Sequence, residues 1–452
     1  MQAIIYAAGR GKKLLPYSSH WQKCAIPICN VPNVLRMVKM VQGLGVDKIK
    51  VIVGYKDNQI RYALRNEVVE FVESKIDGTA PALISLLDED CLVIYGDIIV
   101  YQSDVENLIN KYKNTGNQTI LYSNFTKYER SIDWICCNVE ESQVTAIYGH
   151  PREHYVNGKI GGVFVLDKRI KNYLENNPGY MKNISVGGMP TDECMIEQSI
   201  QMMIEDGEII EGVLSSKPII DIDKPWHLME ANEQIILQEV ASIKEDVIDE
   251  TANIHPSAII EGKIVIGKNS YIGKNVIIKG NVVIGDNTEI DYGAIIEGNV
   301  VIGNNTSIKD YCKILPFSTI GNKNKIGYNA EFQGITFDGV SITHNAEIYG
   351  IVGEYTDIAA GCMAGILRFD DCLNTPKIDG KVEIGSKYTN GIFIGDHCRT
   401  GIANIFMPGI MIGKNCVISP GAVVSKSLPE GTLLIVEQNQ IFKSWGPERY
   451  GW

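Results

Sequence analysis

A glycine-rich turn with basic residues follows the first apolar segment of the chain. Residues Ala3–Tyr6 read as a buried strand, and the run AAGRGKK at residues 7–13 comes directly after it. Small residues in such a turn allow backbone N–H groups to close around phosphate oxygens. An isolated Gly-x-Gly is explained equally well by a plain turn between a strand and a helix. The turn therefore indicates phosphate chemistry only together with further motifs.

Four further motifs follow before residue 235. Lys23 lies in the run QKCAIPI, and Gly78-Thr79-Ala80 comes later. Gly96-Asp97 ends an apolar strand, and the run DIDKPW begins at Asp221. Together with the glycine-rich turn, and in this order, these landmarks resemble the sugar-1-phosphate nucleotidylyltransferase family over about residues 1–235.

The resemblance implies attack by a sugar-1-phosphate oxygen on the α-phosphate of a nucleoside triphosphate, with release of pyrophosphate. Charge neutralisation and in-line positioning carry most of such a reaction. The family match implies two carboxylates that hold Mg²⁺, two catalytic lysines, and small residues around the nucleotide or substrate. The Mg²⁺ ligands would be Asp97 and Asp221, and the catalytic lysines would be Lys23 and Lys13. The residues around the nucleotide or substrate would be Ala8, Gly9, Gly11, Gly78, Thr79 and Gly96. For Asp97 alone, the alternative is an N-cap of the following helix.

Three replacements depart from the family pattern. The arginine usual in the glycine-rich turn is Lys13, which substitutes a point charge for a bidentate guanidinium. Gln22-Lys23 stands for the usual Pro-Lys, and Gly149-His150-Pro151 aligns with the family's Glu-Lys-Pro. The retained carboxylates and Lys23 favour an active enzyme. The replacements favour a second hypothesis, a non-catalytic regulatory or scaffold paralogue that binds sugar nucleotide.

Aliphatic residues recur at unbroken six-residue intervals in the second half of the chain. Many are followed by Gly and then by Asn, Asp or Lys. Gly, Asn and Asp tolerate the positive φ of a tight corner. Each hexad reads as a short strand plus a turn, and three hexads form one coil of eighteen residues. The pattern predicts a left-handed parallel β-helix, interrupted between residues 332 and 394 by projecting loops. The repeated positions are Ile254, Ile260, Ile266, Ile272, Ile278, Ile284, Ile290, Ile296, Ile302, Ile308, Ile314, Ile320, Ile326 and Phe332, then Ile394, Thr400, Phe406, Ile412, Ile418 and Val424.

Before residue 240, apolar runs alternate with amphipathic helical segments. This alternation predicts an α/β, Rossmann-like nucleotidyltransferase domain with a mostly parallel sheet. The expected strands are Ala3–Tyr6, Lys50–Val53, Cys91–Tyr95, Thr119–Tyr122 and Val163–Leu166. We expect this domain at residues 1–235, a helical connector at 236–250, the β-helix at 251–430 and a C-terminal tail at 431–452. The aromatic tail is expected to cover the open end of the prism.

The predicted prism suggests a second reaction. Hexapeptide prisms often carry acyltransferases that use acetyl-CoA and a histidine base. The domain order resembles the bifunctional glucosamine-1-phosphate acetyltransferase and N-acetylglucosamine-1-phosphate uridylyltransferase family, especially its archaeal members. The resemblance implies that His344 is the catalytic base, whereas Glu347 and Ile366 replace the family's Tyr and Asn. A solvated corner residue is the alternative for His344, and an acyltransferase with an inactive N-terminal domain is a third functional hypothesis.

Composition and charge exclude several classes of function. The chain has 452 residues, a formal charge of −12 and no long basic run, so nucleic-acid binding is not expected. No apolar stretch approaches the roughly 18 residues that span a bilayer, and the N-terminus lacks a signal-peptide pattern. The eleven cysteines form no CxxC pair and read as reduced thiols. We expect a cytoplasmic protein without a membrane partner; the resemblance implies a homotrimer that takes a nucleoside triphosphate and a sugar-1-phosphate.

Overall fold

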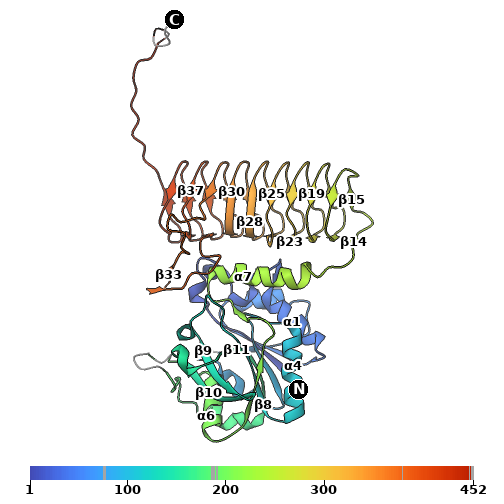
Figure 1. The fold of residues 1–452 in the computed structure, drawn as a ribbon, viewed down its shortest axis with the longest axis vertical. Coiled ribbons are helices and arrows are strands. Elements are labelled where there is room, and N and C mark those ends of the chain that lie inside the picture. The colour runs from blue at the N-terminus through green and yellow to red at the C-terminus, as the bar shows by residue number, and fades with distance from the viewer. Residues whose placement is uncertain (75–77, 185–188, 190–191, 379, 447, 449–452) are drawn as a thin grey trace.

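The chain forms an N-terminal α/β domain and a β-helical prism, with a helix between them (Figure 1). The computed structural model describes residues 1–74, 78–184, 189, 192–378, 380–446 and 448. Within these ranges every helix is too short or too polar to span a bilayer. All eleven cysteines are free thiols.

The N-terminal domain is built on a nine-stranded sheet of order β5-β4-β1-β6-β11-β8-β12-β10-β9. Its strands β5, β4, β1 and β6 are parallel, but β11 runs antiparallel to both of its neighbours, β6 and β8. The predicted mostly parallel direction therefore holds for most strands, but the sheet is mixed because β10 and β11 run against the others. The strands are β1 (Gln2–Ala7), β4 (Ile49–Val53), β5 (Glu70–Glu73), β6 (Cys91–Tyr95), β8 (Gln118–Ser123), β9 (Ile135–Glu140), β10 (Gln143–Gly149), β11 (Gly158–Leu166) and β12 (Ile210–Leu214).

Helices cover both faces of this sheet. Successive side chains of β1 point to opposite faces, so Ile5 packs with α1, α2 and α4, and Ile4 packs with α3, α5 and α6. The helices are α1 (Asn33–Gly43), α2 (Asp57–Ala63), α3 (Ala80–Ile84), α4 (Gln102–Thr115), α5 (Lys171–Glu175) and α6 (Ile196–Glu205). Two short strand pairs lie beside the sheet: β2 (Pro27–Ile28) with β3 (Val31–Pro32), and β7 (Ile98–Ile99) with β13 (Ile220–Asp221).

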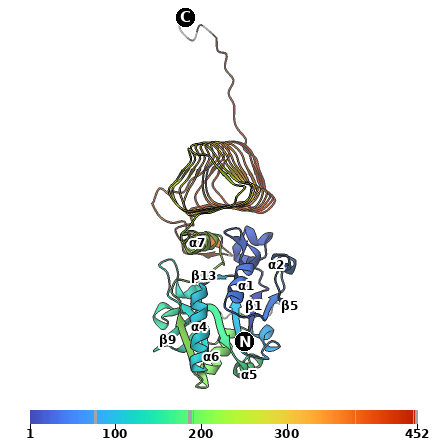
Figure 2. The same ribbon diagram turned by 90° about the vertical axis from the view of Figure 1, so that its right-hand side faces the viewer.

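The second half of the chain is a three-sided parallel β-helix, seen nearly end-on in Figure 2. The predicted hexad positions point inward and form one continuous core. Face A contains β14 (Val247–Ile248), β17 (Ile264–Ile266), β20 (Val282–Ile284), β23 (Val300–Ile302), β26 (Thr319–Ile320), β35 (Ile392–Ile394) and β38 (Met411–Ile412). Face B contains β16 (Ile259–Ile260), β19 (Ile277–Ile278), β22 (Ile295–Ile296), β25 (Lys313–Ile314), β32 (Met363–Ala364), β37 (Ile405–Phe406) and β40 (Val423–Val424). Face C contains β15 (Asn253–Ile254), β18 (Tyr271–Ile272), β21 (Glu289–Ile290), β24 (Ser307–Ile308), β27 (Lys325–Ile326), β29 (Ser341–Ile342), β31 (Asp357–Ile358), β36 (Arg399–Thr400), β39 (Val417–Ile418) and β41 (Leu433–Leu434).

The Gly-Asn and Gly-Asp pairs of the hexads build one corner of the prism. The side chain of Asn304 accepts a hydrogen bond from the backbone N–H of Asp286 at 2.7 Å, one coil away. The side chain of Asn322 likewise accepts a hydrogen bond from the backbone N–H of Asn304 at 2.8 Å. A Cβ on Gly285 would lie 2.4 Å from Asn304 Oδ1, so this position has room only for glycine. The repeated pair thus satisfies corner N–H groups that would otherwise lack a partner.

The coil length changes in the middle of the prism. Ile254 pairs with Ile272, eighteen residues on, but Phe332 pairs with Ile348, only sixteen residues on. The shorter coils contain β28 (Glu331–Thr336) and β30 (Glu347–Val352), which join faces A and B without a separate turn. Each strand turns at a glycine of strongly positive φ, Gly334 or Gly350. The prism therefore continues through residue 364 where loops were expected.

One segment does project from the prism, at residues 365–391. Across it the spacing between paired strands rises to 42 residues, because Gly350 pairs with Ile392. We call this segment the insert; it carries the hairpin of β33 (Lys377–Ile378) and β34 (Lys381–Val382). In Figure 1 the hairpin lies beside the N-terminal domain.

The end of the chain does not close the prism. Figure 1 shows the segment after β41 running away from the last coil. Ile441 and Phe442 are 83% and 88% exposed. The expected cover over the open end is therefore wrong for this chain.

Face A of the prism packs on the N-terminal domain through a helix. Helix α7 (Pro225–Ile235) continues as a π-helix over Ile236–Val240 and lies along this face (Figures 1 and 2). The outward residues Val301, Ile335 and Phe393 share one buried cluster with Trp226. Tyr17 adds a hydrogen bond from its hydroxyl to the carbonyl of Ile351 at 3.1 Å. A continuous apolar contact of this kind holds the two domains in one arrangement.

Glu354 lies at this junction and gives a prediction for stability. Burial, with the nearby Asp396 and Asp338, raises the pKa of Glu354 to about 7, above its ordinary 4.5. The folded state then binds more protons than the unfolded state between these values, so stability falls as pH rises through that window. We expect Glu354→Gln to raise the Tm by a few degrees at about pH 8 and to leave it unchanged at about pH 4.

The test is thermal unfolding followed by circular dichroism at both pH values. Glu347→Gln is the matched control, because Glu347 is an exposed glutamate of the same prism and should give no pH-dependent difference. An equal gain in Tm for Glu354→Gln at both pH values would show that ionisation of Glu354 is not the cause.

Candidate active site

Strand ends bring the two predicted metal ligands together. Strands β1 and β6 are parallel neighbours, with Tyr6 opposite Tyr95, so the glycine-rich turn and Asp97 leave the same edge of the sheet. Strand β13 pairs with β7, which places Asp221 opposite Ile98. The N–H of Ile222 also donates to the carbonyl of Asp97 at 2.8 Å. Asp97 and Asp221 are therefore neighbours although 124 positions separate them.

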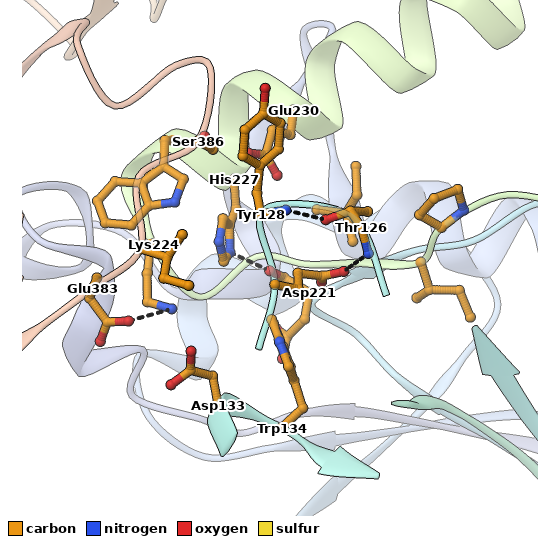
Figure 3. Close-up of a pocket in the computed structure, with 16 residues that line it drawn as sticks. Thr126, Tyr128, Asp133, Trp134, Asp221, Lys224, His227, Glu230, Glu383 and Ser386 are labelled. Carbon is orange, nitrogen blue, oxygen red and sulfur yellow. Dashed lines mark hydrogen bonds and ion pairs between the residues drawn. The ribbon is translucent and has the colours of Figure 1, made fainter. Parts of the chain in front are cut away.

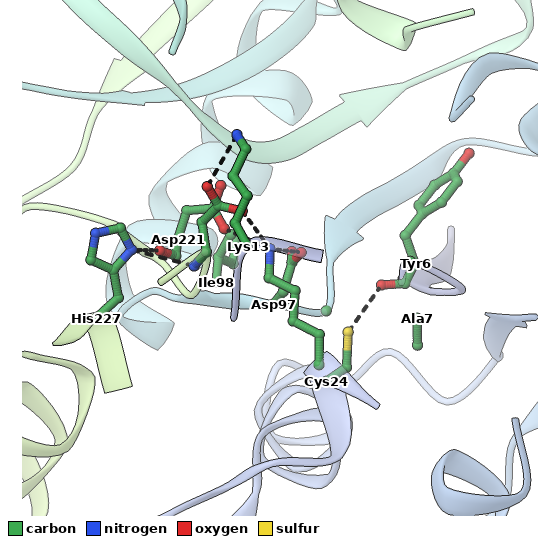
Figure 4. Close-up of polar contacts among 12 residues, drawn as sticks. Tyr6, Ala7, Lys13, Cys24, Asp97, Ile98, Asp221 and His227 are labelled. Atoms are coloured by element: carbon green, nitrogen blue, oxygen red, sulfur yellow. Dashed lines mark hydrogen bonds and ion pairs between the residues drawn. The ribbon is translucent and has the colours of Figure 1, made fainter. Parts of the chain in front are cut away.

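Three carboxylates converge on Lys23. Its Nζ lies 2.8 Å from Asp97 Oδ2, 3.2 Å from Asp221 Oδ1 and 3.8 Å from Asp223 Oδ1. The lysine side chain is 9% exposed, whereas Asp97 and Asp221 remain 26% and 37% exposed. Figure 4 shows Asp97, Asp221 and the predicted Lys13 around the same small space. The cluster is thus closed on the lysine side and open on the carboxylate side.

The charges in this cluster shift the pKa values of its members. Burial alone would lower the pKa of Lys23, but the charges of Asp221, Asp97 and Asp223 raise it well above its usual range. Burial raises the pKa of Asp221, and the charge of Lys23 partly offsets this rise. For Asp223 the neighbouring lysines outweigh burial and lower the pKa. Lys23 therefore stays protonated at every physiological pH.

The glycine-rich turn lies directly over this cluster. Gly11 has φ +60°, and a Cβ there would lie 3.2 Å from Lys23 Cβ. A Cβ on Gly9 would meet nothing within 4 Å, so the turn faces open space at that position. Lys13 Nζ reaches Asp223 Oδ2 at 3.5 Å. Ala8 accepts a backbone hydrogen bond at 3.2 Å, from the N–H of residue 55.

Gly78 and Thr79 join the first strand to helix α6. Gly78 forms a bridge with Cys194, where a Cβ would lie 2.4 Å from the carbonyl oxygen. Thr79 Oγ1 accepts from the N–H of Ile196 at 2.9 Å, and its carbonyl accepts from the Tyr6 hydroxyl at 2.5 Å. These contacts hold the two residues before α3 against the end of β1 and the start of α6.

Gly96 serves close packing at the strand end. A Cβ on it would lie 2.6 Å from the carbonyl oxygen of Tyr6, to which its own N–H donates at 2.8 Å. Any side chain here would push β6 away from β1 and displace the adjacent Asp97.

Several polar residues beside the cluster were not predicted. Asp223 and Lys224 lie in the run DIDKPW, and His227 follows three residues later. The ring Nδ1 of His227 donates to the carbonyl of Asp221 at 2.7 Å, and burial lowers the pKa of His227 to about 3. A neutral histidine thus holds the segment that carries Asp221. The acidic residues of this run are the signal that would have found Asp223.

A pocket adjoins the cluster on the side of Lys224 (Figure 3). It lies between the N-terminal domain and the insert and has a volume of about 50 Å³. It is lined by Thr126, Tyr128, Glu129, Asp133, Trp134, Pro218, Ile219, Ile220, Asp221, Lys224, Trp226, His227, Glu230, Glu383, Ile384 and Ser386.

The predicted acyl-transfer base lies elsewhere. His344 is an exposed corner residue between faces B and C of the prism, and its carbonyl accepts from the N–H of Gly361 at 3.1 Å. Glu347 and Ile366, the two family departures, are also exposed. His344 is not among the residues that line the pocket beside Asp221.

Comparison with known proteins agrees with both halves of the chain. The nucleotidyl transferase family matches residues 2–187. The bacterial transferase hexapeptide family matches residues 263–298 and 299–334. The protein therefore combines a nucleotidyl transferase domain with a hexapeptide-repeat β-helix of the left-handed type, and the resemblance predicted from sequence is confirmed.

The relatives that span both halves are bifunctional. The chain is 28% identical to the bifunctional protein GlmU of Methanocaldococcus jannaschii, over 98% of this chain and 99% of the relative. It is 27% identical to a bifunctional sugar-1-phosphate nucleotidylyltransferase/acetyltransferase of Sulfurisphaera tokodaii, over 95% and 99%. Among solved structures, a UDP-glucose pyrophosphorylase from Acinetobacter covers 53% of this chain and 94% of its own, with 17% identity and a TM-score of 0.43.

Proposed function

We propose that the N-terminal domain transfers a nucleotidyl group from a nucleoside triphosphate to a sugar-1-phosphate and releases pyrophosphate. The observation that carries this proposal is the convergence of Lys23 and three carboxylates below the open glycine-rich turn. The reaction forms a bond between a sugar-phosphate oxygen and the α-phosphorus and breaks the α–β phosphoanhydride bond. Fixed charges beside the phosphates favour this step because the leaving pyrophosphate is highly charged.

Mg²⁺ fits the carboxylate side of the cluster. Asp97 and Asp221 approach the same lysine nitrogen within 3.2 Å, so both can face one cation. No three His, Cys, Asp or Glu side chains in the described ranges form a complete metal site. Magnesium usually takes one or two carboxylates and completes its shell with phosphate oxygens and water, which agrees with this arrangement. Bound there, the ion would neutralise charge on the triphosphate.

The chain's own cations have distinct positions in this proposal. Lys23, buried and protonated, binds a phosphate oxygen and offsets the repulsion among the three carboxylates. Lys13 reaches the cluster through Asp223, so a cation is retained where the family has arginine. This contact favours an active enzyme over the non-catalytic regulatory paralogue.

The test is pyrophosphate release with Mg²⁺ across panels of nucleoside triphosphates and sugar-1-phosphates. We expect at least one pair to give turnover that is lost on addition of EDTA. Nucleotide binding without any pyrophosphate release would instead support the regulatory or scaffold hypothesis.

We propose acyl transfer from acetyl-CoA to an amino-sugar phosphate as a second activity. The hexapeptide repeats and the bifunctional relatives support it. His344 is the proposed base, because its exposed imidazole can reach a ligand bound outside the prism corner. Acyl transfer without pyrophosphate release would favour the hypothesis that only the prism is active.

We also propose that the protein is a cytoplasmic homotrimer that associates through face B. Face A is covered by the N-terminal domain, and most outward side chains of face C are polar. Face B keeps Ile259, Met363, Ile405 and Val423 42–59% exposed. The charged Lys313, Glu331 and Glu347 lie between the first of these residues and the other three. Exposed apolar patches of this kind are typical of association surfaces. We expect a trimeric mass by light scattering at micromolar concentration, and a monomer would contradict this proposal.

A further inference from the structure

The insert connects the prism to the nucleotidyl transferase domain. It leaves the prism after β32 and returns at β35, and its hairpin lies beside the N-terminal domain (Figure 1). Lys381 forms an ion pair with Asp133. At the other end, the Tyr388 hydroxyl donates to Glu233 Oε2 of α7 at 2.8 Å. The insert is therefore anchored on both sides of the pocket next to Asp221.

Between these anchors the insert buries a charge against the active-site segment. Glu383 Oε2 lies 3.2 Å from Lys224 Nζ, and the two side chains are only 4% and 9% exposed. Figure 3 shows this pair facing each other at the edge of the pocket. An isolated charge at this depth would be strongly unfavourable, so each partner requires the other or an equivalent ion.

The charge of Lys224 also acts on the carboxylate cluster around Lys23. It follows Asp223 directly in the chain, and Lys224, Lys23 and Lys13 all help to lower the pKa of Asp223. Lys23 and Lys13 approach the proposed triphosphate site. Lys224 faces the adjoining pocket instead and has its charge neutralised by a residue of the other domain.

The insert narrows the pocket from one side. The water-accessible space of about 50 Å³ has room for a few water molecules. Glu383, Ile384 and Ser386 of the insert supply one wall, and the N-terminal domain and α7 supply the others. Displacement of this one wall would open the pocket next to Asp221 without disturbing the sheet.

We propose that Lys224 binds the phosphate of the sugar-1-phosphate, and that Glu383 of the insert occupies this position until the acceptor displaces it. The inference rests on the proposed nucleotidyl transfer and adds a binding residue to it. A carboxylate and a phosphate monoester are both oxyanions that pair with an ammonium group, so the exchange leaves Lys224 neutralised in both states. Through the insert, the prism would thereby control acceptor binding for nucleotidyl transfer in the N-terminal domain.

The test compares binding to Glu383→Gln and to the wild type. The isosteric amide removes the competing charge, so we expect the Kd for inorganic phosphate and for hexose-1-phosphates to fall about tenfold by calorimetry. The Kd for the nucleoside triphosphate should stay unchanged. Tyr388→Phe is the comparison variant: it loosens the insert at an anchor outside the pocket but leaves the charge opposite Lys224 intact, so its Kd should fall less than that of Glu383→Gln. An unchanged or higher Kd for both probes in folded Glu383→Gln would overturn the proposal.

A second measurement uses the wild-type protein and requires no variant to fold. Saturation with a hexose-1-phosphate should speed hydrogen exchange in residues 380–391, since these leave the N-terminal domain. Slower or unchanged exchange there would also overturn the proposal. If these binding results hold but no sugar-1-phosphate supports pyrophosphate release, the proposed function fails while the phosphate site at Lys224 stands.

Discussion

Replacement of Asp97 or Asp221 by asparagine is expected to lower nucleotidyl transfer by about 10²- to 10³-fold. Both carboxylates converge on one point beside Lys23, and an amide keeps their shape but removes the charge that a divalent cation requires. The loss should fall mainly on kcat at saturating substrates. The concentration of Mg²⁺ needed for half-maximal pyrophosphate release should rise in both variants.

The control for this prediction is another aspartate of the same domain. Asp104 is 2% exposed and accepts hydrogen bonds from the backbone and hydroxyl of Ser216 at 3.0 Å each. Asp104→Asn should lower the Tm without changing the Mg²⁺ dependence. Unchanged activity and unchanged Mg²⁺ dependence in folded Asp97→Asn and Asp221→Asn would remove the metal assignment.

The prism was the most predictable part of the fold. Because each hexad places a large aliphatic side chain at the same point of the interior, the sequence repeats wherever the coil length is constant. The sixteen-residue coils break this rule, since at Gly334 and Gly350 the chain turns a corner without extra turn residues. A change of spacing looks like a loss of repeat, and this is why the prism through residue 364 was mistaken for projecting loops.

The mixed sheet could not be read from apolar runs. A strand buried on both faces has the same composition whichever way it runs, so Val163–Leu166 was identified as a strand without its direction. Pairing of β11 with β6 and β8 depends on long-range contacts that leave no local signal.

The carboxylate cluster was predicted better than its surroundings. Asp97 follows the apolar strand β6, and the resemblance to the family identified both Asp97 and Asp221. Lys224 and Glu383 are 159 positions apart, and their contact depends on how the insert returns to the N-terminal domain. Gly78, Thr79 and Gly96 were predicted to surround the substrate, but their contacts here join strands and loops.

For the prism, His344→Ala is expected to reduce acetyl transfer by about 10²- to 10⁴-fold while acetyl-CoA binding stays nearly intact. A general base affects the proton transfer step, whereas the cofactor tail is held by other contacts. The measurement is thiol release from acetyl-CoA with amino-sugar phosphates, after both proteins are shown to have the same oligomeric state. His255→Ala is the matched control, because His255 lies in the first coils of the same prism and its ring contacts Ser257 at 2.8 Å.

The acetyl-transfer result decides whether His344 is a general base, a solvated corner residue or part of a site that has been lost. Equal transfer by the wild type and His344→Ala would make this histidine a solvated corner residue. No transfer by either protein would indicate that Glu347 and Ile366, which stand where the family has Tyr and Asn, have removed the acyl-transfer site. The prism would then act on the N-terminal domain through its insert, and Glu383→Gln would still change phosphate binding in a chain whose second reaction has been lost.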